Sequence, residues 1–234
     1  MQTTLSRHPR PADAPRLASL VVGFVLGVTA LQAGAAAGPD ADGLVRQRVR
    51  GLDKVYVRPD VALARYDRLR IAPVEVAYKE DWQSQHRGVE AQEAQRIRTE
   101  LATVAVAEFQ RALTSSRKGR PPGYMLVDEV APGVLEVRAA IDDLDIYAPE
   151  IDDAAVRHNY VFSAGKATLR LELRDAASGQ VLARVIDSRE MRRYEDFQLA
   201  TRISNSAEAR DLVADWARQV RKQIDSLRTG RPTP

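Results

Sequence analysis

The chain has 234 residues, of which 44% are hydrophobic and 29% are charged. This length and composition favour one globular domain of moderate size with extensions. Cysteine is absent, which excludes disulfides, thiolate metal sites and a cysteine nucleophile. The formal net charge is +3, and the basic residues are interleaved with acidic ones instead of forming a basic stripe. Nucleic acid is therefore not an expected partner.

Residues 1–37 have the layout of a secretory signal peptide: a basic start, an apolar run and small residues at the end. The apolar run at 17–31 is shorter than the ~20 residues that a stable membrane-spanning helix needs. We expect cleavage after Ala37, or alternatively after Ala35, and a periplasmic or secreted product. An uncleaved N-terminal anchor is the competing interpretation. Lipid anchoring is not expected, because no cysteine follows the apolar run.

The rest of the chain divides into three parts. Residues 38–60 are polar and contain several glycines and prolines, which predicts a flexible arm. Residues 61–228 are predicted to form a single α+β domain, and residues 229–234 a disordered tail. After residue 37 no apolar run is long enough to cross a membrane, so no transmembrane span is expected there.

Alternating and β-branched patterns predict the strands of this domain. Pro73 places the first strand at a sheet edge or at a bulge, because proline cannot donate to a ladder. Ser178-Gly179 predicts the turn of a hairpin between the last two strands. The five predicted strands span 69–78, 124–130, 134–142, 166–175 and 181–188.

Helical spacing of apolar residues predicts two amphipathic helices, at 89–113 and about 206–227. Trp216 lies in the apolar stripe of the second helix and is predicted to be a core residue. The order of elements predicts a two-layer α+β sandwich with a mostly antiparallel sheet of about five strands. Both helices are expected on one face, which leaves the other face charged and open to water or a partner.

The acidic stretch after the strand at 134–142 is the main candidate for chemistry. Asp142, Asp143 and Asp145, with His158 beyond them, are weak candidates for a metal site or a carboxylate-based hydrolase. The spacing of an EF-hand loop is absent, and no nucleophile elbow or phosphate-binding loop occurs. A solvated acidic loop is the simpler interpretation, and no cofactor is expected.

Aromatic residues in or beside the long loops at 79–90 and 145–165 are candidate binding residues. These are Trp82, Tyr147, Tyr160 and Phe162. Loops on a rigid scaffold often carry recognition, and tryptophan and tyrosine are enriched in binding hot spots. The alternative is that these rings only cover the ends of the sheet.

Several segments together resemble a bacterial family, the domain of unknown function 3313, which includes many envelope lipoproteins. The resemblance covers about residues 52–227 and ends with the Trp216 helix. It implies an exported or envelope-attached protein without an established activity, although this chain lacks the lipobox cysteine. The matching segments are Tyr66-Asp67-Arg68-Leu69, Ile71 to Val76, Tyr124 to Asp128, Pro132 to Leu144, Leu171 to Asp175 and Ser178 to Val185.

These observations predict an exported envelope protein that binds or scaffolds and does not catalyse. Its expected partner is an envelope protein or another component of the cell envelope. One alternative is a hydrolase that uses the acidic loop at 142–158. Another is a protein associated peripherally with the membrane or cell wall through the basic residues of the arm at 38–60.

Overall fold

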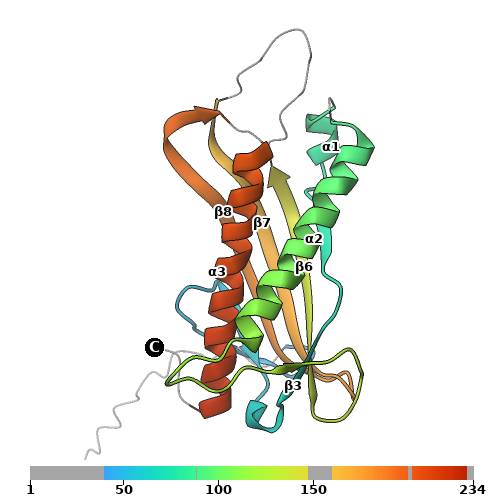
Figure 1. The fold of residues 1–234 in the computed structure, drawn as a ribbon, viewed down its shortest axis with the longest axis vertical. Coiled ribbons are helices and arrows are strands. Elements are labelled where there is room, and N and C mark those ends of the chain that lie inside the picture. The colour runs from blue at the N-terminus through green and yellow to red at the C-terminus, as the bar shows by residue number, and fades with distance from the viewer. Residues whose placement is uncertain (1–39, 88, 147–159, 200–201, 231–234) are drawn as a thin grey trace, which may run out of the picture. The chain divides into compact units, whose positions relative to one another are not determined.

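The computed structural model describes residues 40–87, 89–146, 160–199 and 202–230, and their side chains except at 160–164, 191–199 and 202–208. The predicted signal peptide and residues 231–234 of the tail predicted at 229–234 lie outside the described residues, whereas Thr229 is the last residue of a helix. The described part is a mixed α+β structure with one eight-stranded sheet (Figure 1). Two long helices, α2 (Ala91–Thr114) and α3 (Arg202–Thr229), accompany the short α1 (Trp82–Gln85) and a 3-10 turn at Leu63–Arg65.

The centre of the sheet is the antiparallel set that the alternating patterns predicted. It consists of β6 (Val134–Ile146), β7 (Tyr160–Asp175) and β8 (Val181–Leu199). The predicted hairpin between β7 and β8 is confirmed. Its turn forms because the carboxylate of Asp175 accepts the backbone N–H of Ser178 at 2.9 Å and Gly179 adopts a positive φ of 70°.

Three strands run parallel to their neighbours, which corrects the prediction of a mostly antiparallel five-stranded sheet. The predicted strand at 69–78 is divided around Pro73 into β3 (Arg68–Ile71) and β4 (Glu75–Tyr78), both parallel to β6. The short β5 (Met125–Leu126) pairs in parallel with β3. Helix α2 lies between β4 and β6 in the chain, and such a crossover is what allows two strands to be parallel.

Residues 40–60 of the segment predicted as a flexible arm at 38–60 are part of the folded sheet. They contribute β1 (Val45–Gln47) and β2 (Lys54–Val57), and β2 extends the sheet by pairing antiparallel with β8. Leu44, Val55 and Val57 are buried in the core. The prediction failed because the apolar residues of this segment are too sparse to indicate a core element by themselves. They are buried only because β2 pairs with the edge strand β8.

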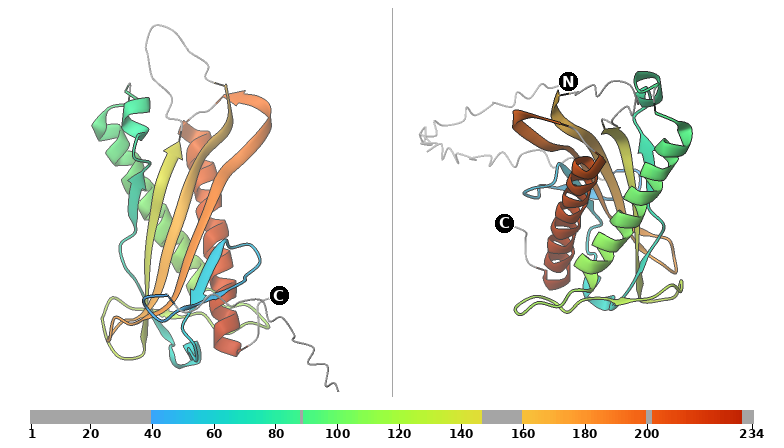
Figure 2. Two further views of the ribbon diagram at one scale, coloured as in Figure 1. Left: turned by 180° about the vertical axis from the view of Figure 1, so that it is seen from behind. Right: turned by 45° about the horizontal axis from the view of Figure 1, so that its top comes forward.

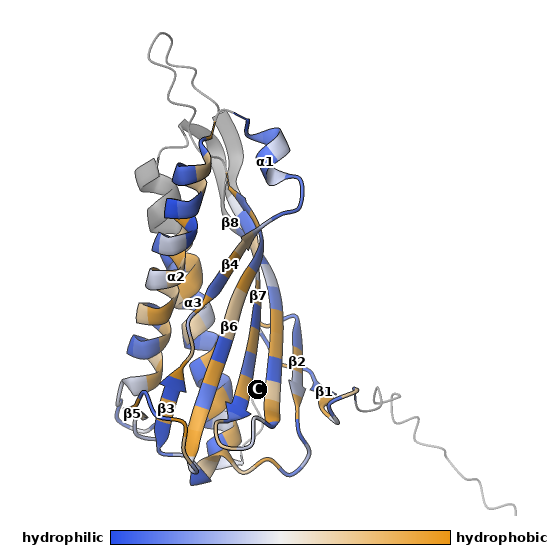
Figure 3. Cartoon of the chain, turned by 90° about the vertical axis from the view of Figure 1, so that its right-hand side faces the viewer, coloured by the Kyte–Doolittle hydropathy of each residue, from blue (hydrophilic) through white to orange (hydrophobic). Residues whose placement is uncertain are grey.

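Helices α2 and α3 cover the same face of the sheet, as predicted (Figures 1 and 2). Their buried side chains and the inward residues of β6, β7 and β8 form one core. The strands alternate between polar and apolar residues along their length (Figure 3). Trp216 is completely buried, which confirms it as a core residue.

A residue of α3 completes the C-terminal end of α2. The guanidinium of Arg221 donates to the carbonyl oxygens of Leu113 at 2.6 Å and Pro121 at 2.9 Å, and to the carboxylate of Asp225 at 2.8 Å. The last carbonyls of a helix have no partner within the helix, so a cation placed there satisfies them and complements the helix dipole. Arg221 therefore joins the two helices through buried polar contacts.

The sheet face opposite α2 and α3 is called the outer face here. Seen from behind, this face has no helix over it in the described part of the chain (Figure 2). None of the helices within the described ranges is both long and apolar enough to span a membrane.

Candidate functional site

The outer face carries a band of paired charges across the sheet. Strand alternation places the even-numbered residues at 136–142 of β6 and 166–174 of β7 on this face, opposite the buried odd-numbered ones. The register then sets Glu136 opposite Arg174, Arg138 opposite Glu172, and Glu172 opposite Arg184. Opposite charges in facing positions stabilise a sheet, so the band is consistent with the strand pairing.

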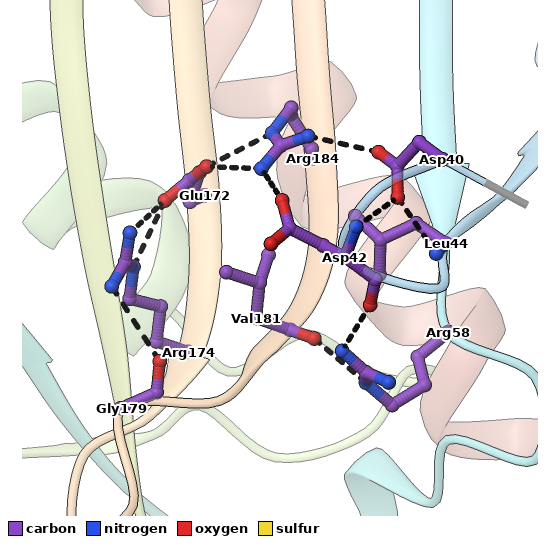
Figure 4. Close-up of polar contacts among 9 residues, drawn as sticks. All are labelled: Asp40, Asp42, Leu44, Arg58, Glu172, Arg174, Gly179, Val181 and Arg184. Atoms are coloured by element: carbon purple, nitrogen blue, oxygen red, sulfur yellow. Dashed lines mark hydrogen bonds and ion pairs between the residues drawn. The ribbon is translucent and has the colours of Figure 1, made fainter.

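Arg184 lies at the centre of the most connected part of the band (Figure 4). Its Nε donates to Glu172 Oε1 at 2.9 Å, and its Nη1 donates to Asp40 Oδ2 at 2.9 Å. Its Nη2 also pairs with the carboxylate of Asp42. One guanidinium thus joins β7, β8 and the start of the described chain, which planar arginine groups do well because their donors are fixed in a fork.

The start of the described chain is held in a defined turn beside this arginine. The carboxylate of Asp40 accepts the backbone N–H groups of Asp42 at 3.0 Å and Leu44 at 2.9 Å. Arg58 donates from Nη2 to the carbonyl of Asp42 at 2.7 Å and from Nε to the carbonyl of Val181 at 2.8 Å. The turn at 40–44 is therefore fastened both to β8 and to the chain just after β2.

Glu172 of the band is held in its ionised form. Burial acts to raise the pKa of Glu172, but hydrogen bonds and charges from Arg174 and Arg184 outweigh it and lower that pKa. Glu136 is buried and accepts Nε of Arg138 at 2.8 Å, and Arg70 also pairs with it. The ion pairs of both glutamates hold the surface in one arrangement, and Glu172 is poorly suited to donate a proton at neutral pH.

Exposed guanidinium groups remain available along the band. The side chains of Arg138 and Arg170 are 56% and 62% exposed, although each pairs with a carboxylate. Arginine is enriched at protein interfaces, where it donates hydrogen bonds in several directions. The outer face can therefore offer ordered donors to a polar partner.

The predicted acidic candidates do not converge on one centre. Asp142 pairs with Arg170 across the sheet, and Asp145 receives Lys79 Nζ at 3.4 Å. Asp143 is exposed at a bulge in β6, with a positive φ of 52°. His158 lies outside the described residues. Across residues 40–87, 89–146, 160–199 and 202–230, no group of three His, Cys, Asp or Glu side chains is placed to hold a metal ion.

Of the predicted aromatic binding residues, the structure places Trp82 in the core. Its indole is completely buried, donates to the carbonyl of Ile146 at 2.8 Å and stacks between the rings of Tyr78 and His86. Trp82 is thus closed to a partner, because it fills the space between β4, α1 and β6. Tyr147 lies outside the described residues. Tyr160 and Phe162 lie in β7, at positions whose side chains are outside the described set.

Sequence reasoning missed the residues that organise the band, chiefly Arg184, Asp40 and Asp42. The signal for Arg184 was present, since it alternates with buried Ala183 and Val185 in a predicted strand. Nothing local connects it to Asp40, which lies 144 positions earlier in the chain.

Comparison with known proteins gives a family. A family model described as "Protein of unknown function (DUF3313)" matches residues 38–220. The chain belongs to this family. No curated protein matches it by sequence.

Solved structures show only distant likeness to this member of the family. The PelC dodecamer from Paraburkholderia phytofirmans is 14% identical, with a TM-score of 0.37 over 71% of this chain and 98% of that one. A putative neuraminyllactose-binding hemagglutinin homolog from Helicobacter pylori is 8% identical, with a TM-score of 0.30 over 70% of this chain and 86% of that one.

Proposed function

We propose that this protein is exported to the bacterial envelope and acts there as a binding or scaffolding module without catalytic activity. The observation that carries the proposal is the outer face, an ordered band of arginine–carboxylate pairs on a sheet surface that no described helix covers. Charge patterns of this kind give a protein interface specificity and orientation more than raw affinity. The proposed partner is an envelope protein or another envelope component with complementary polar groups.

The state of the carboxylates supports binding over turnover. General acid catalysis needs a carboxyl whose pKa is close to the working pH. Glu172 has a lowered pKa, and Asp142 and Asp145 are each paired with a cationic side chain. These carboxylates suit a fixed electrostatic surface.

Charge reversal on the outer face tests the proposal. We expect Arg138→Glu combined with Arg170→Glu to abolish recovery of a partner in cross-linking and co-purification from the native envelope. Arg218→Glu, an equally exposed arginine on α3, is the matched control and should retain the partner. Equal recovery with the reversed face and the control would exclude the outer face as the binding surface.

The export part of the proposal has its own test. Residues 1–37 are proposed to be removed during secretion, so N-terminal sequencing of the protein from a periplasmic fraction should start at Gly38. Recovery of the intact N-terminus from the cytosol would contradict this part and leave the binding proposal to be judged separately.

A second candidate function is peripheral attachment to an anionic membrane surface. Arg46, Arg48 and Arg50 are exposed along and beside β1 and form no ion pair within the described part of the chain. Each basic residue near an anionic bilayer contributes roughly 1 kcal/mol, so binding should be modest and salt-sensitive. Replacing all three by glutamine should abolish co-sedimentation with phosphatidylglycerol vesicles. Substitution is a cleaner test than deleting residues 38–60, which would remove β1 and β2 from the sheet.

A further inference from the structure

A polar hollow lies on the molecule apart from the band of the outer face. It is lined by the loop at 51–53, by β8 at 187–189 and by Gln219 of α3, and its volume is about 380 Å³. Pockets that bind small molecules have volumes of roughly 300–1,000 Å³, so this open hollow lies at the small end of that range.

The hollow is built around a buried charge. Asp187 occupies an inward position of β8 and is only 2% exposed. Its carboxylate accepts the backbone N–H of Asp53 at 2.8 Å, the indole N–H of Trp216 at 2.8 Å and Nε of Arg189 at 2.6 Å. These donors satisfy the buried carboxylate and connect the loop, β8 and α3 in a fixed arrangement.

Asp187 in turn fixes the donor groups of Arg189. Nε of Arg189 donates to Asp187, and Nη2 donates to the carbonyl of Gly51 at 2.7 Å, so two hydrogen bonds fix the position of the guanidinium. Its third nitrogen, Nη1, has no partner in the described part of the chain. A preorganised donor loses little entropy when it binds a ligand.

Two further polar groups of the lining are unused. The carboxamide of Gln219 makes no hydrogen bond to any described residue. In the carboxylate of Asp53, Oδ2 accepts the backbone N–H of Ser188, whereas Oδ1 accepts no hydrogen bond from a described residue. A Cβ at Gly51 would come within 3.4 Å of the Gln219 amide, and Gly51 has a φ of 84°. The positive φ favours glycine at this position, and a larger residue would also place its Cβ against the amide.

The charges and donors of the lining define the ligand. Two carboxylates and one guanidinium line the hollow, and this net negative charge disfavours an anion. The free donor Nη1 belongs to the cationic guanidinium of Arg189, which disfavours a cation at that donor. The groups left free are the donor Nη1 of Arg189, the acceptor Oδ1 of Asp53 and the amide of Gln219, which can both donate and accept. A hydroxyl group both donates and accepts, so adjacent hydroxyls of one sugar ring can match all three. We propose that this hollow binds a neutral saccharide.

The two tryptophans of the chain allow a direct test by NMR. The indole N–H of Trp216 donates to Asp187, which lines the hollow, whereas that of Trp82 donates to the carbonyl of Ile146, which does not line it. The protein is purified as the cell processes it and titrated with maltose and with N,N′-diacetylchitobiose. We expect saturable movement of the Trp216 indole signal with a Kd on the order of 1 mM for at least one disaccharide, while the Trp82 signal stays fixed.

Substitution of Gln219 makes the test specific. Gln219→Ala should weaken disaccharide binding about tenfold, because it removes the free amide without breaking a hydrogen bond of the fold. Gln92→Ala is the matched control, since Gln92 is an exposed glutamine on α2 that also makes no hydrogen bond to a described residue. Control binding should equal that of the wild type.

In the NMR titration, the proposal is overturned if the Trp216 signal does not move at tens of millimolar disaccharide, or if both indole signals move equally. It is also overturned if Gln219→Ala binds disaccharide as well as the wild type does, or if another class of probe binds more strongly. Glucuronic acid, glucosamine and acetylated trialanine amide represent anions, cations and peptides in the same titration. Reversal of Arg138 and Arg170 on the outer face should leave saccharide binding intact, so this inference and the proposed function can fail independently.

Discussion

Replacement of Arg221 tests the connection between the two long helices. Arg221→Met keeps most of the length and the apolar stem of the side chain but removes the buried guanidinium. The carbonyl of Pro121 and the carboxylate of Asp225 then lose the Arg221 donor, and the carbonyl of Leu113 keeps only the backbone N–H of Tyr124, at 3.0 Å. Asp225 is itself 8% exposed, and its Oδ2 already has no hydrogen-bond partner among the described residues. The substitution therefore leaves a charge buried without compensation.

The expected loss follows from that unpaired charge. Breaking a buried ion pair by removing one partner costs about 3–5 kcal/mol. For domains of roughly 150–250 residues, each kcal/mol lowers Tm by about 2–4 °C, which predicts a fall of about 6–20 °C. Urea unfolding followed by far-ultraviolet circular dichroism measures the free energy of unfolding, and thermal unfolding measures Tm.

A double substitution separates the charge from the packing. Arg221→Met with Asp225→Leu removes both charges, so it should be more stable than Arg221→Met alone. Arg218→Met, which removes an exposed arginine of the same helix, should change stability by less than about 0.5 kcal/mol. A loss below about 1 kcal/mol in Arg221→Met, or simple additivity in the double variant, would refute this account of how α2 is held.

Three further predictions concern stability. Gly123→Ala should destabilise the protein by more than about 2 kcal/mol in urea unfolding, because its Cβ would lie 1.8 Å from the carbonyl oxygen of Thr114; a wild-type midpoint would contradict this geometry. Trp216→Phe should cost at least about 1.5–3 kcal/mol, since Asp187 loses a donor while buried, and an unchanged Tm would mean that the indole hydrogen bond contributes nothing. The backbone N–H of Ser178 lowers the pKa of Asp175, so the stability from this carboxylate is present above about pH 4 and is lost as pH falls through its folded pKa. Asp175→Asn should therefore flatten the acid limb of a plot of urea midpoint against pH, and an unchanged acid limb would show that Asp175 does not contribute.

Much of the outer face could be predicted as a pattern but not as a set of contacts. The sequence predicted a charged face opposite the helices, and Glu136, Arg138, Glu172 and Arg174 lie on that face. Strand alternation makes Asp187 exceptional, since a carboxylate occupies an inward position of β8. Its donors come from distant segments, so the pattern alone could not indicate whether this carboxylate is satisfied.

The sequence by itself determined the local structure: the two helices from their apolar stripes, the β7–β8 hairpin from alternation around Ser178-Gly179, and the core position of Trp216. These features depend on residues within a few positions of each other, where backbone period and turn chemistry decide. Only the tertiary structure decided that residues 45–57 extend the sheet, that β3 and β4 run parallel to β6, and that Arg184 pairs with Asp40. Such pairings depend on surfaces that exist only after distant segments have come together, because a short polar strand is stable only beside an existing sheet edge.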